Sequence, residues 1–450
     1  KFFQRPYHEV EVDLFLRAIY SQWQLRELMV EFWHNVLHAN CRSETYADNI
    51  AVCFADYDRT VIRRFCLGNF GKMLKASARH PVMLMYLQGT DSNVKAADGG
   101  ASCVADELSP NENYGRELLE LHTVGVRSFE EADVKRAARA FSGWLFGHTR
   151  GYYCSEIGPL PPQDGRVYFK PMLNSFRKPS TEDRFLGETV KSWTWPEKTN
   201  RLIEGIPDDS EGMRLLETLA AHPKTAHHIV GRMVQRLVDR RENESLSRMM
   251  HDRGVDAWTE DPGSDHQIRN TLRAILTTPG LITAAPTKAK TPFETVASFY
   301  RATGMPFRHS LSLWDLLGSN GARPFEWPTV AGRPDKNDHW LSAAAVGQRR
   351  RLLFGLADES LNGTGPLLDP VGPLGGDATC RTAVAYWAVQ LGWENAEADR
   401  IMDLAVQVAG GADPVNAPIR RNYETVRRLR QAIAAMAYGT ETIYVVRRLG

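Results

Sequence analysis

The segment 111–125 places carboxylate, guanidinium, imidazole and amide side chains on a single predicted helix. The reactive residues are Asn113, Arg116, Glu117, Glu120 and His122. Two carboxylates that face one cleft raise the pKa of one of the pair, so that together they can give and take protons. We therefore predict that Glu117 and Glu120 form a catalytic acid/base pair, with the other three side chains binding substrate.

Helical geometry divides this group. At about 100° per residue, Asn113, Glu117 and Glu120 share one face of an α-helix and His122 lies nearly opposite. The spacing from Glu120 to His122 is also too short for the Glu-x-x-His metal motif of helical bundles. The simpler alternative is a ladder of i, i+4 ion pairs through Arg116, with His122 capping the end of the helix.

His34 and His38 are candidate metal ligands, because an i, i+4 spacing lets two imidazoles bind one ion. No glutamate follows His34, so the pair is not the H-E-x-x-H motif of a metalloprotease. The alternative is a set of polar residues that line a buried helix end. Asn35, between the two histidines, is a further candidate for substrate binding.

Other candidates each have a structural alternative. His222 precedes Pro223, and the pair is typical of a helix start as well as of a cleft wall. Aromatic and cationic side chains could stack on a sugar or hold an anion, although aromatic residues more often pack in the core. The stacking candidates are Arg139, Trp144, Trp327 and Trp340, and the anion candidates are Lys288, Lys290 and Arg301.

Composition excludes several classes of function. The 450 residues are 43% hydrophobic and 24% charged, which is typical of a globular protein with a sizeable core. A formal net charge of +1 gives no electrostatic argument for nucleic acid. No apolar run reaches the roughly 18 residues of a membrane span. Because the glycine-rich and nucleophile-elbow motifs are missing, we expect no nucleotide cofactor, while a metal remains possible.

The six cysteines show no C-x-x-C or zinc-ligand spacing, and their redox state stays open. Cys53 and Cys66 are expected to be small core residues. The chain opens on Lys1-Phe-Phe-Gln-Arg5 without an apolar leader, and we expect a first segment to precede this numbering.

Apolar periodicity predicts a mainly α-helical protein. The first helix is expected from Val10 to Ala39, and Pro81 is expected to open another. Short strands are predicted at 167–169 and 442–446, and longer loops at 88–110, 147–200, 304–342 and 358–379. Further helices are predicted near 61–67, 111–124, 131–146, 212–240, 265–277, 292–303, 343–357, 381–391, 396–408 and 418–437.

Three parts follow from this pattern. Residues 1–146 form an N-terminal helical part, 147–200 an irregular part with short strands, and 201–450 a C-terminal helical part. We expect the two helical parts to pack as one large domain with long covering loops.

Several ordered motifs carry a family resemblance. They include Gln24-Leu-Arg-Glu-Leu-Met-Val-Glu-Phe-Trp-His-Asn35, His80-Pro-Val-Met-Leu-Met-Tyr-Leu87, the segment 111–125, Asp133-Val-Lys-Arg-Ala-Ala-Arg-Ala-Phe-Ser-Gly-Trp144, His222-Pro-Lys-Thr-Ala226, Lys290-Thr-Pro-Phe-Glu294 and Trp327-Pro-Thr-Val-Ala-Gly332. On these motifs the chain resembles the bacterial DUF1800 family, whose function is unknown. The resemblance implies an extracytoplasmic protein, periplasmic or secreted, and a family segment expected before Lys1.

The chain departs from the family pattern at three places. Val36 stands where the family has a histidine, Gln88 where it has an aspartate, and Asn174-Ser175 where it has His-Asp. These departures remove groups that bind metals or move protons.

Two functions of different class follow. The first is an exported enzyme, hydrolase- or lyase-like, that acts by acid/base chemistry on a polar small molecule or glycan in a helix-lined cleft. The alternative is a non-catalytic binding or scaffold protein of the cell surface, and a weaker one is a metal-dependent enzyme that uses His34 and His38.

Overall fold

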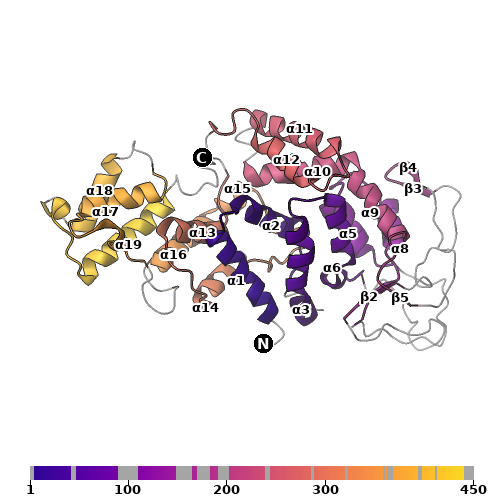
Figure 1. Ribbon diagram of the computed structural model, residues 1–450, viewed down its shortest axis with the longest axis horizontal. Helices are drawn as coiled ribbons and strands as arrows, with labels where there is room; N and C mark the ends of the chain where they lie inside the picture. Colours follow the sequence, from indigo (N-terminus) through magenta and orange to yellow (C-terminus); the bar gives the residue numbers. More distant parts are fainter. Residues whose placement is uncertain are drawn as a thin grey trace.

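The computed structural model is mainly α-helical, as the sequence predicts, with a few short strands at one side (Figure 1). The residues that it describes are 5–41, 47–89, 110–147, 165–169, 183–190, 202–238, 244–284, 288–319, 323–357, 361, 368–393, 398–410 and 413–439.

The first predicted helix is in fact two helices, α1 (Arg5–Tyr20) and α2 (Gln24–Val36). The prediction of one helix from Val10 to Ala39 is therefore wrong. Side-chain hydrogen bonds break the helix at Ser21: its hydroxyl accepts from the Trp23 amide at 3.0 Å, and its carbonyl accepts from the Gln24 amide group at 2.7 Å. Such local bonds compete with the helical ladder.

A long interrupted helix follows. α3 (Ala47–Tyr57) continues through a π-helical turn, η1 (Asp58–Ile62), into α4 (Arg63–Phe65). Next come α5 (Phe70–Arg79), which was not predicted, and α6 (Pro81–Tyr86), which Pro81 opens as predicted.

The reactive segment folds as α7 (Glu112–Glu117) and a second π-helical turn, η4 (Leu118–His122). It packs closely on α8 (Glu131–Ala140), because Gly115 has no side chain: a Cβ there would come within 2.9 Å of the Ala138 amide nitrogen.

The predicted helix 131–146 ends at Ala140, and its last residues form the strand β1 (Trp144–Phe146). β1 pairs antiparallel with β2 (Val167–Phe169), the predicted strand, and β2 pairs with β5 (Ile203–Glu204). A separate hairpin joins β3 (Asp183–Phe185) and β4 (Glu188–Val190). The predicted strand at 442–446 lies outside the described residues.

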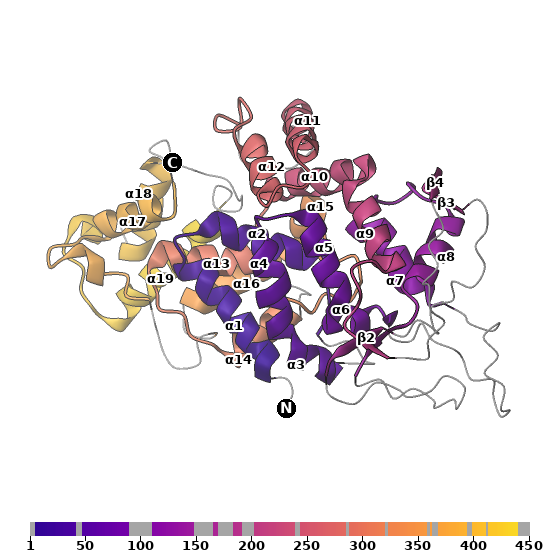
Figure 2. The same cartoon turned by 45° about the vertical axis from the view of Figure 1, so that its right-hand side comes forward.

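The predicted helix 212–240 is divided at His222 into α9 (Glu211–Ala221) and α10 (Pro223–Leu237). α11 (Glu244–Glu260) was not predicted, and α12 (Gln267–Leu276) was. α10, α11 and α12 lie together at the upper edge of the molecule in both views (Figures 1 and 2).

The C-terminal part begins with α13 (Pro292–Thr303), at the predicted residues, because Thr291 and Glu294 form a capping box and Gly304 ends the helix at φ +64°. α14 (Leu311–Gly318) and α15 (Asn337–Trp340) lie where a loop was predicted. The helices that follow are α16 (Ala343–Ala357), α17 (Cys380–Gln390), α18 (Ala398–Ala409) and α19 (Tyr423–Tyr438). Two 3₁₀ turns lie between them, η6 (Gly372–Leu374) and η8 (Asp413–Asn416).

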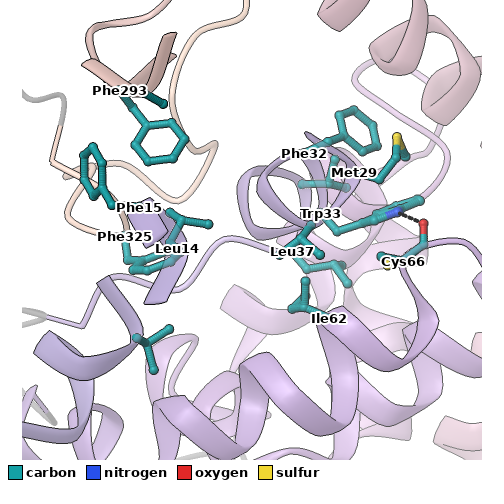
Figure 3. Packing of buried hydrophobic residues seen from close by; sticks show 14 of the residues in the cluster. Leu14, Phe15, Met29, Phe32, Trp33, Leu37, Ile62, Cys66, Phe293 and Phe325 are labelled. Carbon is teal, nitrogen blue, oxygen red and sulfur yellow. Dashed lines mark hydrogen bonds between the residues drawn. The ribbon is translucent and has the colours of Figure 1, made fainter. Parts of the chain in front are cut away.

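One contiguous apolar core extends from Tyr7 in α1 to Ala437 in α19. α13 and α16 lie between the α17–α19 group and α1 and α2 (Figure 1). In the core, the Trp33 indole donates to the Cys66 carbonyl at 3.0 Å, and Phe15 meets Phe293 edge to face at 4.6 Å (Figure 3). This core holds the ends of α2 and α10 in fixed positions.

Candidate functional site

A cleft of about 490 Å³ lies between α10 and the segment 331–336. Its walls are mostly polar. They are formed by His227, His228, Gly231, Arg232 and Gln235 from α10 and by Ala331, Gly332, Arg333, Pro334, Asp335 and Lys336 from the facing segment. The end of α2 and the turn η4 support these walls from behind.

Asn35, at the end of α2, fixes the segment 331–336. Its amide oxygen accepts from the Arg333 backbone amide at 2.6 Å, and its amide nitrogen donates to the Arg333 carbonyl at 2.9 Å and the Asp335 carboxylate at 3.3 Å. Gly332 has φ +71°, and a Cβ there would lie 2.5 Å from the Asn35 carbonyl oxygen. The predicted substrate-binding residue Asn35 therefore builds the wall of the cleft.

The turn η4 meets α10 at the Leu121 carbonyl. This oxygen lies 3.2 Å from His228 Nε2 and accepts from the Arg232 guanidinium at 3.4 Å. The π-helical turn thus lies directly behind the wall formed by α10. π-Helical turns cost stability and are frequent at functional sites.

Arg232 and Arg236 lie one turn apart on α10 but have different surroundings. Arg236 donates to Glu31 at 2.8 Å and to Glu294 at 2.6 Å. Arg232 donates only to backbone carbonyls, those of Leu121 and Asn35, and forms no ion pair within the described part of the chain. Burial lowers the pKa of Arg232, with the Asp335 charge opposing this. Arg232 is thus a cation without a carboxylate partner in the wall of a cleft.

Asp335 adds a hydrogen-bond acceptor to the cleft that contains the Arg232 donor. One of its carboxylate oxygens accepts from Asn35, while the other, Oδ1, is buried and has no hydrogen-bond partner among the described residues. A buried acceptor without a partner costs free energy unless a ligand or water supplies a donor. The cleft therefore presents a donor for an anion and an acceptor for a hydroxyl group.

Two histidines behind this wall, His38 and His122, and His228 in the wall itself all have lowered pKa values. Burial lowers the pKa of His38 to about 4 and that of His122 to about 3, with the positive charge of Arg232 contributing at both. Burial also lowers the pKa of His228, again with a contribution from Arg232. Lowered pKa values favour the neutral form of the three imidazole rings, so Arg232 is the positive charge among these side chains.

The predicted acid/base pair is half-buried, with Glu117 at the end of α7 and Glu120 in η4, and neither carboxylate is among the residues that line the cleft. Burial raises the pKa of Glu117, and the Glu120 charge raises it further. Neither carboxylate forms an ion pair with Arg116 among the described residues; Arg116 instead pairs with Glu131 at 2.7 Å and more weakly with Glu112 at 3.5 Å. The predicted ladder consists of the pairs Glu112–Arg116 and Arg116–Glu120. The first pair is present, and the second does not occur among the described residues.

The π-helical turn changes the predicted geometry around His122. An angle of 100° per residue does not hold through Leu118–His122, so the predicted separation of His122 from Glu117 and Glu120 rested on a wrong helix type. His122 is buried, and the Thr123 hydroxyl, rather than His122, donates to the Leu118 carbonyl at the helix end. Burial and the nearby charge of Arg232 lower the pKa of His122.

The family of the chain follows from its sequence as a whole. Residues 2–442 match the model of the family described as "Protein of unknown function (DUF1800)". The chain belongs to the DUF1800 family. No curated protein and no solved structure matches it. In the described part of this DUF1800 protein, no helix has the length and apolarity needed to cross a membrane.

Four of the seven motifs that carry the DUF1800 resemblance lead to the cleft or to the elements beside it. The first ends at Asn35, the segment 111–125 forms η4, and the motif that starts at His222 opens α10. The motif 327–332 leads into the wall that faces α10. Segments far apart in sequence thus meet at one site.

The predicted metal pair lies beside this site. His34 Nε2 hydrogen-bonds to Asp58 at 2.8 Å, within a buried chain that continues to Arg63 and Glu27. His38 Nε2 lies 3.0 Å from the Trp327 carbonyl. No group of three metal-binding side chains occurs in the described ranges. Metal binding by His34 and His38 stays a prediction.

The other predicted residues lie apart from the walls of the cleft. His222 caps α10, accepting from the Lys224 amide at 3.1 Å, and Asn113 donates to the Leu87 carbonyl at 3.3 Å. Trp144 is buried against Phe141, and Arg139 lines a different, shallow depression.

Sequence reasoning missed Arg232, His228 and Asp335 as a group. The only signal for the first two was their i, i+4 spacing on one helix, which places both on one face. Nothing in the sequence shows that Arg232 lacks a carboxylate partner while Arg236 has two.

Proposed function

We propose that this DUF1800 protein binds an acidic glycan, a sugar that carries carboxylate groups, in the cleft between α10 and the segment 331–336. The observation that carries the proposal is Arg232, a cation in the cleft wall with no carboxylate partner in the described part of the chain. Arginine binds a carboxylate through paired donors that match its geometry. The buried Asp335 oxygen without a partner adds an acceptor for a sugar hydroxyl.

The charge of the cleft supports an anionic ligand. Arg232, Arg333 and Lys336 line it against a single carboxylate, Asp335. Arg333 is engaged by Glu31, and Lys336 is exposed, so Arg232 is the cation positioned to orient a ligand. A neutral sugar leaves Arg232 without a carboxylate partner and is expected to bind more weakly.

The catalytic part of the proposal assigns acid/base chemistry to Glu117 and Glu120. A half-buried carboxyl group with a raised pKa keeps its proton to a higher pH than an exposed one and can donate it to a leaving oxygen. Without turnover, the same cleft is the binding site of a non-catalytic surface protein.

The experiment compares galacturonic acid, galactose and propionate by titration calorimetry, because the three probes separate the carboxylate from the hydroxyl groups. We expect the uronic acid to bind at least about tenfold more tightly than either other probe, since hydrogen bonds to charged groups contribute about 1.5–3 kcal/mol. Equal binding of galactose would contradict the role of Arg232.

Turnover is tested separately with oligogalacturonides and the Glu117→Gln variant. We expect product release by the wild-type protein and a loss of at least about 100-fold in the variant, as for other general acids. Binding without turnover in the wild-type protein would overturn the catalytic part and support the non-catalytic alternative.

The proposal includes an extracytoplasmic location, which rests on the family resemblance. Fractionation of the native cells checks it, and recovery of the protein in the cytoplasmic fraction would contradict it.

A further inference from the structure

A second pocket, of about 450 Å³, lies between α1, α2, α10 and α13 and shares no lining residue with the cleft. Its volume is within the usual range of small-molecule sites. Most of its wall is aliphatic or aromatic. The apolar lining residues are Leu14, Ala18, Leu25, Leu28, Leu237, Leu276, Leu281, Phe293 and Ala297.

The carboxylates in this pocket are already neutralised. Glu27 accepts from Arg63 at 2.7 Å, and Glu31 and Glu294 both accept from Arg236. None of the three is therefore a free negative charge that would repel an anion.

Two cationic side chains in the same pocket can still donate a hydrogen bond to a ligand. Lys290 hydrogen-bonds to the Ser298 hydroxyl at 3.3 Å and forms no ion pair among the described residues. Arg236 is 3% exposed, and its Nη1 is buried with no hydrogen-bond partner among the residues that the structure describes. An unpaired buried donor is costly, so the pocket is completed by a ligand that supplies an acceptor.

Exposed apolar side chains flank the lining residues in sequence. Leu25 lines the pocket and is 38% exposed, Trp23 precedes the lining residue Gln24 and is 66% exposed, and Ile282 follows the lining residue Leu281 and is 86% exposed. Of these three side chains, Leu25 is the one that lines the pocket.

We propose that this pocket binds a medium-chain alkyl carboxylate, with the chain between α1, α2 and α13 and the carboxylate at Lys290 and Arg236 Nη1. This is a second site, and it does not depend on glycan binding in the cleft. The apolar wall selects the chain, and the Lys290 ammonium together with Arg236 Nη1 selects an anionic head over a neutral or cationic one.

The proposal predicts that affinity for the carboxylate depends on pH. Burial lowers the pKa of Lys290 to about 8, with the Glu294 charge opposing this and the Arg349 charge adding to it. The other charged groups that line the pocket are Glu27 and Glu31 from α2, Arg236 from α10 and Arg301 from α13. Because Lys290 loses its proton through this range, we expect affinity for the carboxylate to fall about tenfold between pH 7 and pH 9.

The test is calorimetric titration with decanoate below its micelle concentration, beside decanol and decyltrimethylammonium. We expect decanoate to bind most tightly, Lys290→Gln to weaken decanoate at least about tenfold without weakening decanol, and Ala18→Phe, which fills the apolar part, to abolish both. Melting curves of each variant establish that it is folded.

Equal affinity for decanoate and decanol, or unchanged decanoate affinity in Lys290→Gln, would overturn the proposal. Galacturonic acid serves as an internal control, because Lys290→Gln is expected to leave binding in the cleft unchanged. A loss of glycan binding in Arg232→Gln with decanoate binding intact would separate the two sites.

Discussion

At the scale of single residues, the site depends on which charges are paired. Arg232 and Arg236 belong to the same helix, but two carboxylates hold Arg236 and only backbone carbonyls hold Arg232. The two carboxylates of α7 and η4 likewise lack ion pairs among the described residues, although Arg116 is close in sequence. Charged side chains without ion-pair partners are frequent at functional sites, so we expect the site to lie near these residues.

Glu117→Gln is expected to stabilise the protein slightly at pH 7. The folded-state pKa of Glu117 is raised, so ionisation costs folding free energy, and the cost grows as pH rises through that pKa. Replacing the carboxylate removes this cost, and we expect a gain of about 0.5 kcal/mol in the free energy of unfolding, absent below pH 4.

Urea denaturation at pH 7 and pH 4 measures the gain. Glu112→Gln is the matched control on the same helix, because Glu112 hydrogen-bonds to Arg116. A destabilised Glu117→Gln variant at pH 7 would show that Glu117 serves the fold instead of a site.

His38 and His122 are expected to make the protein acid-sensitive. Their folded pKa values, about 4 and about 3, lie below the ordinary value near 6.5, so the unfolded chain binds more protons between these limits. Stability is therefore complete above pH 6.5 and is lost as pH falls toward 4. At about 1.4 kcal/mol per pKa unit, the loss by pH 4 is up to about 3 kcal/mol per histidine.

Chemical denaturation at several pH values tests this, with His122→Gln beside the wild-type protein. The variant is expected to show a shallower loss of stability between pH 6.5 and pH 4. An identical slope would mean that His122 is protonated equally in the folded and unfolded states.

At the scale of elements, two π-helical turns and one close backbone contact shape the site. η1 begins with Asp58, the partner of His34, and η4 ends with His122. The segment 331–336 approaches α2 so closely at Gly332 that no side chain fits against the Asn35 carbonyl.

Gly332→Ala is expected to displace this segment and weaken ligand binding in the cleft. The new Cβ would lie 2.5 Å from the Asn35 carbonyl oxygen, in addition to the cost of φ +71° for any residue with a side chain. We expect a loss of at least about 2 kcal/mol of stability, measured by urea denaturation.

Gly280→Ala is the matched control, because Gly280 has φ +85° and a Cβ there meets no atom within 4 Å. The control measures the conformational cost alone. Equal losses in the two variants would contradict the close contact between Gly332 and α2.

Helix ends were predictable from the sequence where capping residues mark them. α13 begins after Thr291 and ends before Gly304, at the predicted residues. The break at Ser21 was not predictable from periodicity, because the apolar pattern continues across it while side-chain hydrogen bonds decide the backbone. The π-helical turn at Leu118–His122 has no sequence pattern of its own, so the type of helix at His122 could not be predicted.

At the scale of the whole molecule, a buried ionic network joins distant parts of the chain. Glu31 in α2 accepts from Arg236 in α10 and from Arg333 beside the cleft, and Arg236 continues to Glu294 in α13. Arg333 lines the cleft and Glu31 lines the second pocket, so the network lies between the two cavities. Its partners are up to 302 residues apart, which no local pattern in the sequence reveals.

Glu31→Gln is expected to cost about 3–5 kcal/mol of stability, because it takes the carboxylate partner from Arg333 and removes one of the two carboxylates that hold Arg236. Glu244→Gln, which removes an exposed i, i+4 pair with Arg248, is the control and is expected to change stability by at most about 0.5 kcal/mol. Urea denaturation compares them, and a loss below about 1 kcal/mol in Glu31→Gln would show that the network is not essential.

The most direct test of the central claim is the affinity of galacturonic acid for the wild-type protein, Arg232→Gln and the control Arg248→Gln. Arg248 is exposed on α11 and pairs with Glu244. We predict that Arg232→Gln weakens binding at least about tenfold while Arg248→Gln leaves it unchanged. Equal affinity in all three proteins would contradict the assignment of the cleft as an anion-binding site.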